Sequence, residues 1–186
     1  MKKDKQIWYK DDLNRNVINN EGVFNEEILD LRIQEPDYKE WKTLVLYALN
    51  KGYPMDILAT PLLNASEIRL IIDTIYENDS TRNKIQDYQV YRLSRMELDY
   101  SKLKLSLVAL KYGLDFYEAL PNFQNYCSEI LWYILIGHVV CKTNFCKVVK
   151  QNTDLDKLRT IVKKQYQLRG RKQLLSELFK EFGKTI

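Results

Sequence analysis

Residues 44–76 read LVLYALNKGYPMDILATPLLNASEIRLIIDTIY, and residues 105–136 follow the same outline as LSLVALKYGLDFYEALPNFQNYCSEILWYILI. In each stretch, apolar residues first recur at helical spacing, which predicts a helix, and a glycine, Gly52 or Gly113, then marks the end of that helix. Glycine is the usual residue at the left-handed end of a helix. A short connector with a proline and a second apolar helix follow in both stretches. The pattern predicts a unit of two helices that occurs twice.

Short identities favour an internal duplication. Both stretches contain the motif A-L-x-x-G. The dipeptide Asp-Tyr precedes it, starting at Asp37 and Asp99, and Glu-Ile follows it, starting at Glu67 and Glu129. Units of this size cannot bury their apolar faces alone, so they must stack on neighbours. The alternative is that two amphipathic helix pairs resemble each other by chance, because leucine, alanine and glycine recur wherever helices end.

The composition of the chain agrees with a helical globular protein. Of 186 residues, 45% are apolar and 29% are charged, and six glycines and four prolines are too few for a loop-rich β fold. No window of strict apolar–polar alternation is long enough for a β-strand. We predict an all-α fold of roughly eight to ten helices, either a helical repeat or an irregular bundle built on the duplication.

Three segments are expected along the chain. Residues 1–20 are polar apart from one short apolar cluster, Ile7-Trp8-Tyr9, and predict an N-terminal arm. Residues 21–150 contain both copies and are expected to form the duplicated helical domain. Residues 151–186 are expected to be a basic C-terminal helical segment that packs on this domain.

Further helices are expected outside the two copies. Apolar spacing predicts a helix over residues 84–94, with Tyr88 on its inner side. Residues 139–149 and 155–168 predict two more helices. Gly170 is expected to end the second of these helices, and a last amphipathic helix is expected after it.

Short segments of both copies carry a family resemblance. The segments NASEIR at residues 64–69, LATP at 58–61 and GLD at 113–115 are similar to short helical repeats in proteins of phages and mobile elements of Gram-positive bacteria. The second copy departs from this outline, because no arginine follows Ile130 and its proline connector is shorter. The resemblance implies a non-catalytic helical scaffold whose surface binds a partner. A host-defence protein such as a CRISPR effector would be a natural target.

A cluster of metal-ligand residue types lies in residues 127–146. It contains Cys127, His138, Cys141 and Cys146, and thiolate and imidazole are the ligands that tetrahedral zinc prefers. The spacing C-x10-H-x2-C-x4-C is not a known zinc pattern, however, and free cysteine is a common buried residue. We therefore expect no metal and no cofactor.

Catalytic signatures are absent from the sequence. A pair formed by His138 and Cys141 is conceivable, but no third group or oxyanion hole stands at a recognisable spacing. The phosphate-loop, dinucleotide and zinc-protease motifs GxxxxGK[ST], GxGxxG and HExxH do not occur. We expect that the chain is not an enzyme.

Charge is distributed unevenly. Residues 142–186 contain twelve Lys and Arg against four acidic residues, whereas the rest of the chain has more acidic than basic residues. Such a segment can bind an acidic protein surface or a nucleic-acid backbone, or it can be a solvated helix face. We favour a protein partner and keep nucleic acid as the alternative, because aromatics for base stacking are few. The candidate binding residues are Lys157, Arg159, Lys163, Lys164, Tyr166, Arg169, Arg171 and Lys172.

A cytoplasmic location is expected. The N-terminus, MKKDKQIWYKDDLNRN, has no apolar run behind it and is not a secretory signal. The longest apolar stretch, residues 130–140, is too short to span a bilayer, so no membrane partner is expected. Three cysteines, an odd number, fit a reducing compartment better than a disulfide framework.

Overall fold

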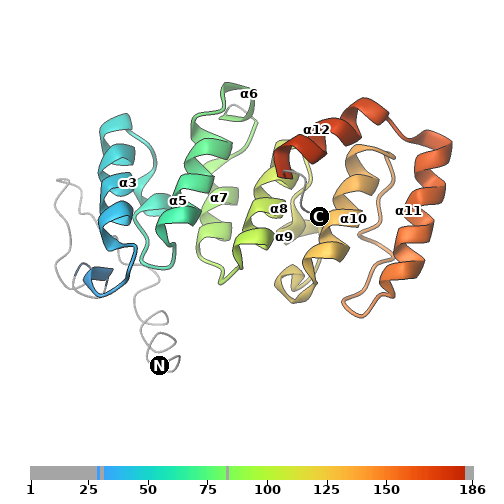
Figure 1. Cartoon of the computed structure of the whole chain (residues 1–186), viewed down its shortest axis with the longest axis horizontal. Helices are drawn as coiled ribbons and strands as arrows, with labels where there is room; N and C mark the ends of the chain where they lie inside the picture. Colours follow the sequence, from blue (N-terminus) through green and yellow to red (C-terminus); the bar gives the residue numbers. More distant parts are fainter. Residues whose placement is uncertain (1–28, 30–31, 83, 183–186) are drawn as a thin grey trace. The chain divides into compact units, whose positions relative to one another are not determined.

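The computed structural model describes residue 29 and residues 32–82 and 84–182. These residues form helices and connecting turns with no β-strand among them (Figure 1). The prediction of an all-α fold is therefore confirmed for this part of the chain. The expected arm over residues 1–20 lies outside the described residues. Within them, every helix is too short or too polar to cross a bilayer.

The helices fall into two compact units, one ending at Leu98 and one beginning at Asp99. The division expected at residues 20 and 150 stays a prediction. The helices of the first unit are α3 (Tyr38–Lys51), α4 (Met55–Leu58), α5 (Ala65–Ile71), the π-helix η1 (Ile72–Tyr76), α6 (Asp79–Arg82) and α7 (Asp87–Ser94). The helices of the second unit are α8 (Tyr100–Lys111), α9 (Phe116–Ala119), the 3-10 helix η2 (Phe123–Asn125), α10 (Ser128–Val139), α11 (Leu155–Arg169) and α12 (Lys172–Phe182).

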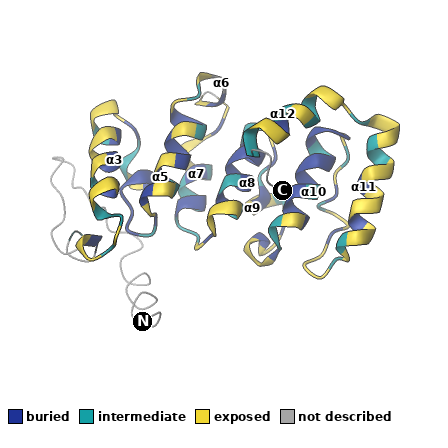
Figure 2. Ribbon diagram, viewed as in Figure 1, coloured by how far each residue is buried: buried dark blue, intermediate teal, exposed yellow. Residues whose placement is uncertain are grey.

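In the first unit, α3 packs against α5, and α4 packs against α7. The apolar stripe of α3 is buried at Trp41, Val45 and Ala48, and that of α5 is buried at Ile68 and Ile71. These side chains recur at three- and four-residue intervals, so they lie on one face of each helix. Figure 2 shows the opposite face of α3 exposed to solvent, as expected for a one-sided amphipathic helix.

Two side chains hold the start of α5. Asn64 accepts a hydrogen bond from the backbone N–H of Glu67 (2.9 Å), and the Glu67 carboxylate accepts one from the N–H of Asn64 (2.8 Å). This capping box satisfies donors that the helix itself cannot pair. The carboxylate of Asp37 accepts a further bond from the N–H of Ala65 (2.7 Å) and pairs with Arg32 (2.7 Å). Because Asp37 directly precedes α3, it joins the starts of both helices.

α5 continues into the π-helical turn η1. The backbone N–H of Glu77 donates to the carbonyl oxygen of Ile72, five residues back, at 2.9 Å. The wider turn places Ile75 and Tyr76 together in the core. The Tyr76 ring stacks on the ring of Tyr53, with the centroids 5.1 Å apart. Since Tyr53 follows the glycine that ends α3, this stack ties the end of η1 to the end of α3.

In the second unit, α10 is the central helix. It contacts α8, α11 and α12, and it is buried along most of its length (Figure 2). Side chains on several of its faces are covered, including those of Leu131, Trp132 and Ile134. A helix that is apolar on all sides must be covered on all sides, and these three neighbours supply the cover.

Both units end their first long helix in the same way. Gly52 follows α3 with φ +70°, and Gly113 follows the last turn of α8 with φ +79°. The residue after each glycine donates its N–H to the alanine of the A-L-x-x-G motif, at 3.0 Å in the first unit and 2.8 Å in the second. This is a Schellman cap, so the helix stops predicted at the two glycines are confirmed.

Replacing Gly52 or Gly113 with valine is expected to lower the free energy of unfolding by roughly 1–3 kcal/mol. A Cβ at either position would meet no atom within 4 Å, so the cost arises from the positive φ and not from a clash. Asparagine tolerates left-handed backbone, so Gly52→Asn and Gly113→Asn are the matched controls and should retain most of the stability. Urea denaturation compares the four variants. Equal midpoints for the valine and asparagine variants would contradict this explanation.

The prediction of a helix over residues 139–149 is wrong. α10 ends at Val139, and the chain then reverses through Lys142, which has a left-handed φ of 53°. The N–H of Thr143 donates to the carbonyl oxygen of Gly137 (2.8 Å), and the Phe145 side chain is buried. The apolar residues of this segment are therefore buried by folding back toward α10, which a helical continuation would not allow.

The inward placement of Tyr88 is also wrong. Its side chain is 49% exposed, and Val90 and Leu93 are the buried residues of α7. The helix begins only at Asp87, and its 3.6-residue period puts residues 90, 93 and 94 on the inner face. The Tyr88 ring instead lies beside the guanidinium of Arg92, one turn later, at 4.9 Å.

Candidate functional site

The candidate binding residues all lie on α11, on α12 or between them. Their charged side chains are exposed, and Tyr166 is half-buried. The structure brings Arg159, Lys163 and Tyr166 together on one flank of α11, where they line a groove. It does not place Lys157 or Lys164 there.

The basic residues of α11 therefore occupy two faces of the helix. Leu158 and Val162 define its buried face against the rest of the unit. Lys157 and Lys164 are two turns apart on the outward side, in line with the exposed side chains of Ile161 and Leu168. The candidate cations of α11 therefore do not form one continuous ridge.

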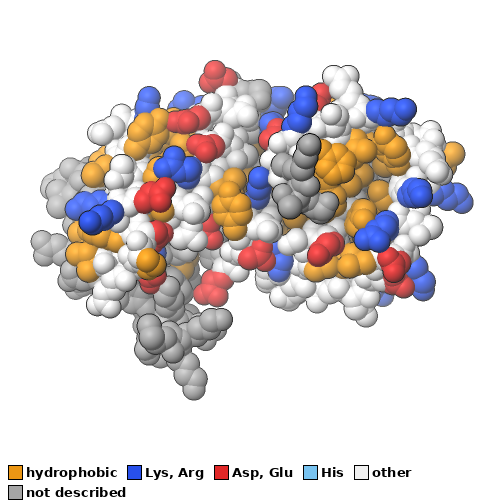
Figure 3. Space-filling model, viewed as in Figure 1, with side chains coloured by type: hydrophobic (Ala, Val, Ile, Leu, Met, Phe, Trp, Pro, Cys, Tyr) orange, Lys and Arg blue, Asp and Glu red, His pale blue; other side chains and the backbone are white. Residues whose placement is uncertain are grey.

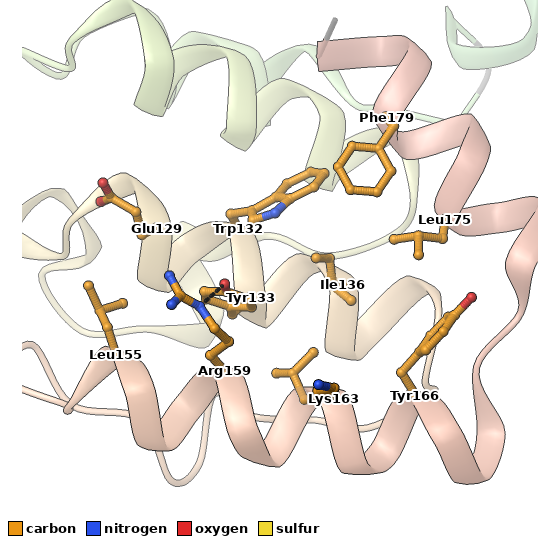
Figure 4. Close-up of a pocket in the computed structure, with 11 residues that line it drawn as sticks. Glu129, Trp132, Tyr133, Ile136, Leu155, Arg159, Lys163, Tyr166, Leu175 and Phe179 are labelled. Atoms are coloured by element: carbon orange, nitrogen blue, oxygen red, sulfur yellow. Dashed lines mark hydrogen bonds between the residues drawn. The ribbon is translucent and has the colours of Figure 1, made fainter. Parts of the chain in front are cut away.

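The groove lies between α10, α11 and α12 and has a volume of about 520 Å³. α10 supplies its floor, while α11 and α12 form its walls (Figure 4). The residues that line it are Glu129, Trp132, Tyr133, Ile136, Leu155, Arg159, Val162, Lys163, Tyr166, Leu175 and Phe179.

The floor and one wall of the groove are apolar and aromatic. Trp132 of α10 is 4% exposed, whereas Phe179 of α12 is 42% exposed. Their ring centroids are 5.6 Å apart, and the ring of Phe182 meets Trp132 edge-on at 5.0 Å. Figure 3 shows hydrophobic side chains gathered where the three helices meet. A partly exposed aromatic above a buried tryptophan is the kind of surface that a protein partner covers.

The α11 wall of the groove is cationic. Arg159 Nε donates to the Tyr133 hydroxyl (2.9 Å, Figure 4), and Arg159 Nη1 contacts the carboxylate of Asp156 (3.3 Å). The hydrogen bond with Tyr133 also raises the pKa of Arg159, and the same bond orients the guanidinium, which is charged at neutral pH in any case. Lys163 follows one turn later. Within the described residues its ammonium group has no hydrogen bond or ion pair.

A second hollow, of about 410 Å³, lies in the first unit beside Tyr76 and Asp87. Its polar groups already meet one another, because the Tyr76 hydroxyl donates to the Asp87 carboxylate at 3.4 Å. The guanidinium of Arg82 lies over the Tyr53 ring at 5.7 Å. Burial raises the pKa of Tyr76, which keeps its hydroxyl protonated. These contacts make the hollow a weaker candidate than the groove.

The cysteines and the histidine are dispersed. Cys127 precedes α10 and Cys141 follows it, at opposite ends of a helix about 18 Å long. His138 Nε2 lies 3.3 Å from the carbonyl oxygen of Tyr112, and burial raises the pKa of the Cys141 and Cys146 thiols. In the described part of the chain, no three His, Cys, Asp or Glu side chains gather as a metal site. The expected absence of zinc stays a prediction, which elemental analysis of protein purified without chelator would test.

Sequence reasoning identified the cations of the groove but missed Trp132, Tyr133 and Phe179. The exposure of Phe179 could have been predicted from the apolar stripe of α12. Phe179 lies at the edge of this stripe, where a side chain is only partly covered, and not at its centre. Trp132 and Tyr133 gave no such signal, since α10 is apolar on every side. Compared with known proteins, the chain matches no family model, no curated protein and no solved structure.

Proposed function

We propose that this chain is a non-catalytic α-helical binding protein and that the groove on α10, α11 and α12 is where it contacts another protein. The observation that carries this proposal is the exposure of Phe179 above the buried Trp132, beside the positioned guanidinium of Arg159. Aromatic anchors with a charged rim are typical of the energetic centres of protein interfaces.

Nucleic-acid binding through the basic C-terminal third is the second candidate. It is favoured by the net charge of +8 over residues 142–186 and by the exposure of the candidate lysines and arginines. The division of these cations between two faces of α11 argues against it, because a phosphate backbone is best neutralised by a continuous basic track.

Two sets of substitutions separate the candidates. Phe179→Ala removes the exposed aromatic of the groove, and Ile161→Ala is its control because it removes an exposed apolar side chain from the outer face of α11. The variant with Lys163, Lys164, Arg169 and Arg171 all changed to glutamine removes positive charge on both faces. The glutamine variant and Ile161→Ala should leave the melting temperature nearly unchanged, and Phe179→Ala should lower it modestly, because its ring packs on Trp132 but is 42% exposed.

The experiment is affinity capture from cells of the native host, with and without nuclease. A protein interface predicts capture that survives nuclease, is lost with Phe179→Ala and is kept with Ile161→Ala. Capture that disappears with nuclease and with the glutamine variant, but not with Phe179→Ala, would overturn the protein-binding proposal. A steep loss of affinity for DNA or RNA with salt would then support the second candidate.

A host-defence protein such as a CRISPR effector is the partner we propose, if the chain belongs to a phage or mobile element. The resemblance of residues 58–69 to helical repeats of such elements supports this choice. Target cleavage by a purified CRISPR nuclease, measured with and without the chain, tests it directly. Unchanged cleavage at saturating chain concentration would remove that class of nuclease from consideration.

We also infer an internal duplication as the origin of the two units. Its support is the repeated order of a long helix, a left-handed glycine, a one-turn helix and a second long helix. In both units the two long helices pack together, α3 with α5 and α8 with α10.

A further inference from the structure

The groove follows the length of one helix. The residues that α11 contributes are Leu155, Arg159, Val162, Lys163 and Tyr166, which recur at helical spacing along a single flank. From first to last they span three turns, or about 16 Å at about 1.5 Å per residue. The wall is therefore long enough to meet three turns of another helix lying alongside it, which is the geometry of helix-in-groove recognition.

The groove offers two kinds of contact to such a helix. Trp132, Ile136 and Phe179 form an apolar strip that would accept apolar side chains one turn apart. Arg159 and Lys163 border this strip at positions i and i+4, so their side chains lie one turn apart, with Cβ atoms about 6 Å from each other. A partner helix with two carboxylates at the same spacing would pair with both.

The two cations of the groove differ in the partners that they already have. Arg159 is already held by Tyr133 and Asp156, so it presents its remaining N–H groups in a fixed direction. Lys163 has no such partner among the described residues, and a carboxylate of the ligand would be its first. Glu129, the acidic residue of the lining, lies near the end marked by Leu155 (Figure 4), so Lys163, which lies farther along α11, is within the described part of the chain an unpaired positive charge of the groove.

From this shape and charge we infer that the groove binds an acidic amphipathic helix, with apolar side chains against Trp132 and Phe179 and carboxylates one turn apart against Arg159 and Lys163. This inference rests on the proposed protein-binding function and adds the chemistry of the partner.

A displayed library of random peptides of about 18 residues, or five helical turns, supplies the probe. Selection on the wild-type chain, with removal of clones that also bind the Phe179→Ala variant, isolates ligands of the groove. We expect the selected peptides to be acidic, to have apolar residues at i, i+3 or i+4, and i+7, and to become helical by circular dichroism when bound.

Charge reversal then tests the pairing with Lys163. Lys163→Glu should weaken a selected peptide about tenfold in fluorescence anisotropy, since an attractive pair becomes a repulsive one. Lys157→Glu is the matched control, because it makes the same change on the outer face of the same helix and should leave affinity unchanged. Replacing the facing carboxylate of the peptide with lysine should restore binding to Lys163→Glu, which also shows that this variant is folded.

The contradicting results are distinct. Selected peptides that are basic, neutral or extended, yet depend on Phe179, would overturn the acidic helix and keep the groove as a protein-binding site. Equal loss with Lys163→Glu and Lys157→Glu would show only a general effect of charge and would also overturn the specific pairing. A selection that yields no peptide dependent on Phe179 would overturn both this inference and the proposed use of the groove.

Discussion

Replacing Trp41 with alanine is expected to lower the free energy of unfolding by about 3–5 kcal/mol. The Trp41 side chain is 0% exposed, and its ring stacks on Tyr38 with the centroids 6.5 Å apart. The guanidinium of Arg32 lies 5.3 Å from the Trp41 ring and pairs with Asp37, whose carboxylate accepts a hydrogen bond from the N–H of Ala65 at the start of α5. Alanine would therefore leave a cavity and also remove the aromatic ring beside the Arg32 guanidinium of this ion pair. Urea denaturation at constant pH measures the loss.

Trp41→Phe is the matched control for this prediction. In the described part of the chain the Trp41 indole N–H is buried and has no hydrogen-bond partner, so replacing the indole with a phenyl ring removes volume but no hydrogen bond. Its cost should be less than half that of Trp41→Ala. If both substitutions cost about 1 kcal/mol or less, the packing of α3 against α5 would not be a main source of stability in the first unit.

The long helices α3 and α5 of the first unit could be predicted because each one is amphipathic on its own. Trp41, Val45 and Ala48 mark a face of α3 at helical spacing, and glycine and asparagine mark the helix ends by local chemistry alone. These signals involve residues within a few positions of one another. They do not depend on which helix is the neighbour, so the sequence contains them directly.

The segment after α10 could not be predicted in the same way. Val139, Val140, Phe145 and Val149 have the density of apolar residues expected of a helix, and all four are buried. What decides the conformation is a tertiary contact, the return of Phe145 to Gly137. Local apolar spacing cannot distinguish a continued helix from a chain that reverses and buries the same residues.

The candidate site was predictable in composition but not in geometry. The excess of Lys and Arg in the last quarter of the chain is visible in the sequence, but which of them act together depends on the face of α11 that is buried. Leu158 and Val162 take that face, which places Lys163 at the groove and Lys164 away from it. The aromatic floor forms only because α10 packs against α12, and no local sequence pattern predicts this tertiary contact.

Replacing Gly137 with valine is expected to lower the free energy of unfolding by about 3 kcal/mol, the upper part of the range for overpacked cores. A Cβ at this position would lie 2.2 Å from Cδ2 of Phe145 and 3.2 Å from the carbonyl oxygen of Thr143. Gly137→Ala should also destabilise the protein, although alanine is favoured over glycine by about 1 kcal/mol inside a helix. If Gly137→Ala lowers the free energy of unfolding, packing dominates at this position. If it raises the free energy of unfolding, helix propensity dominates.

A double-mutant cycle identifies Phe145 as the cause. Phe145→Ala alone should cost about 3–5 kcal/mol because it empties a buried site. In its presence Gly137→Ala no longer meets the Phe145 ring and keeps only the 3.2 Å approach to the Thr143 carbonyl oxygen, so its effect should become neutral or much less destabilising. The expected coupling between the two positions is about 1–3 kcal/mol, the clash removed by the second substitution. Additive effects within about 0.5 kcal/mol would mean that Phe145 does not pack against Gly137, and that the chain after α10 follows another path.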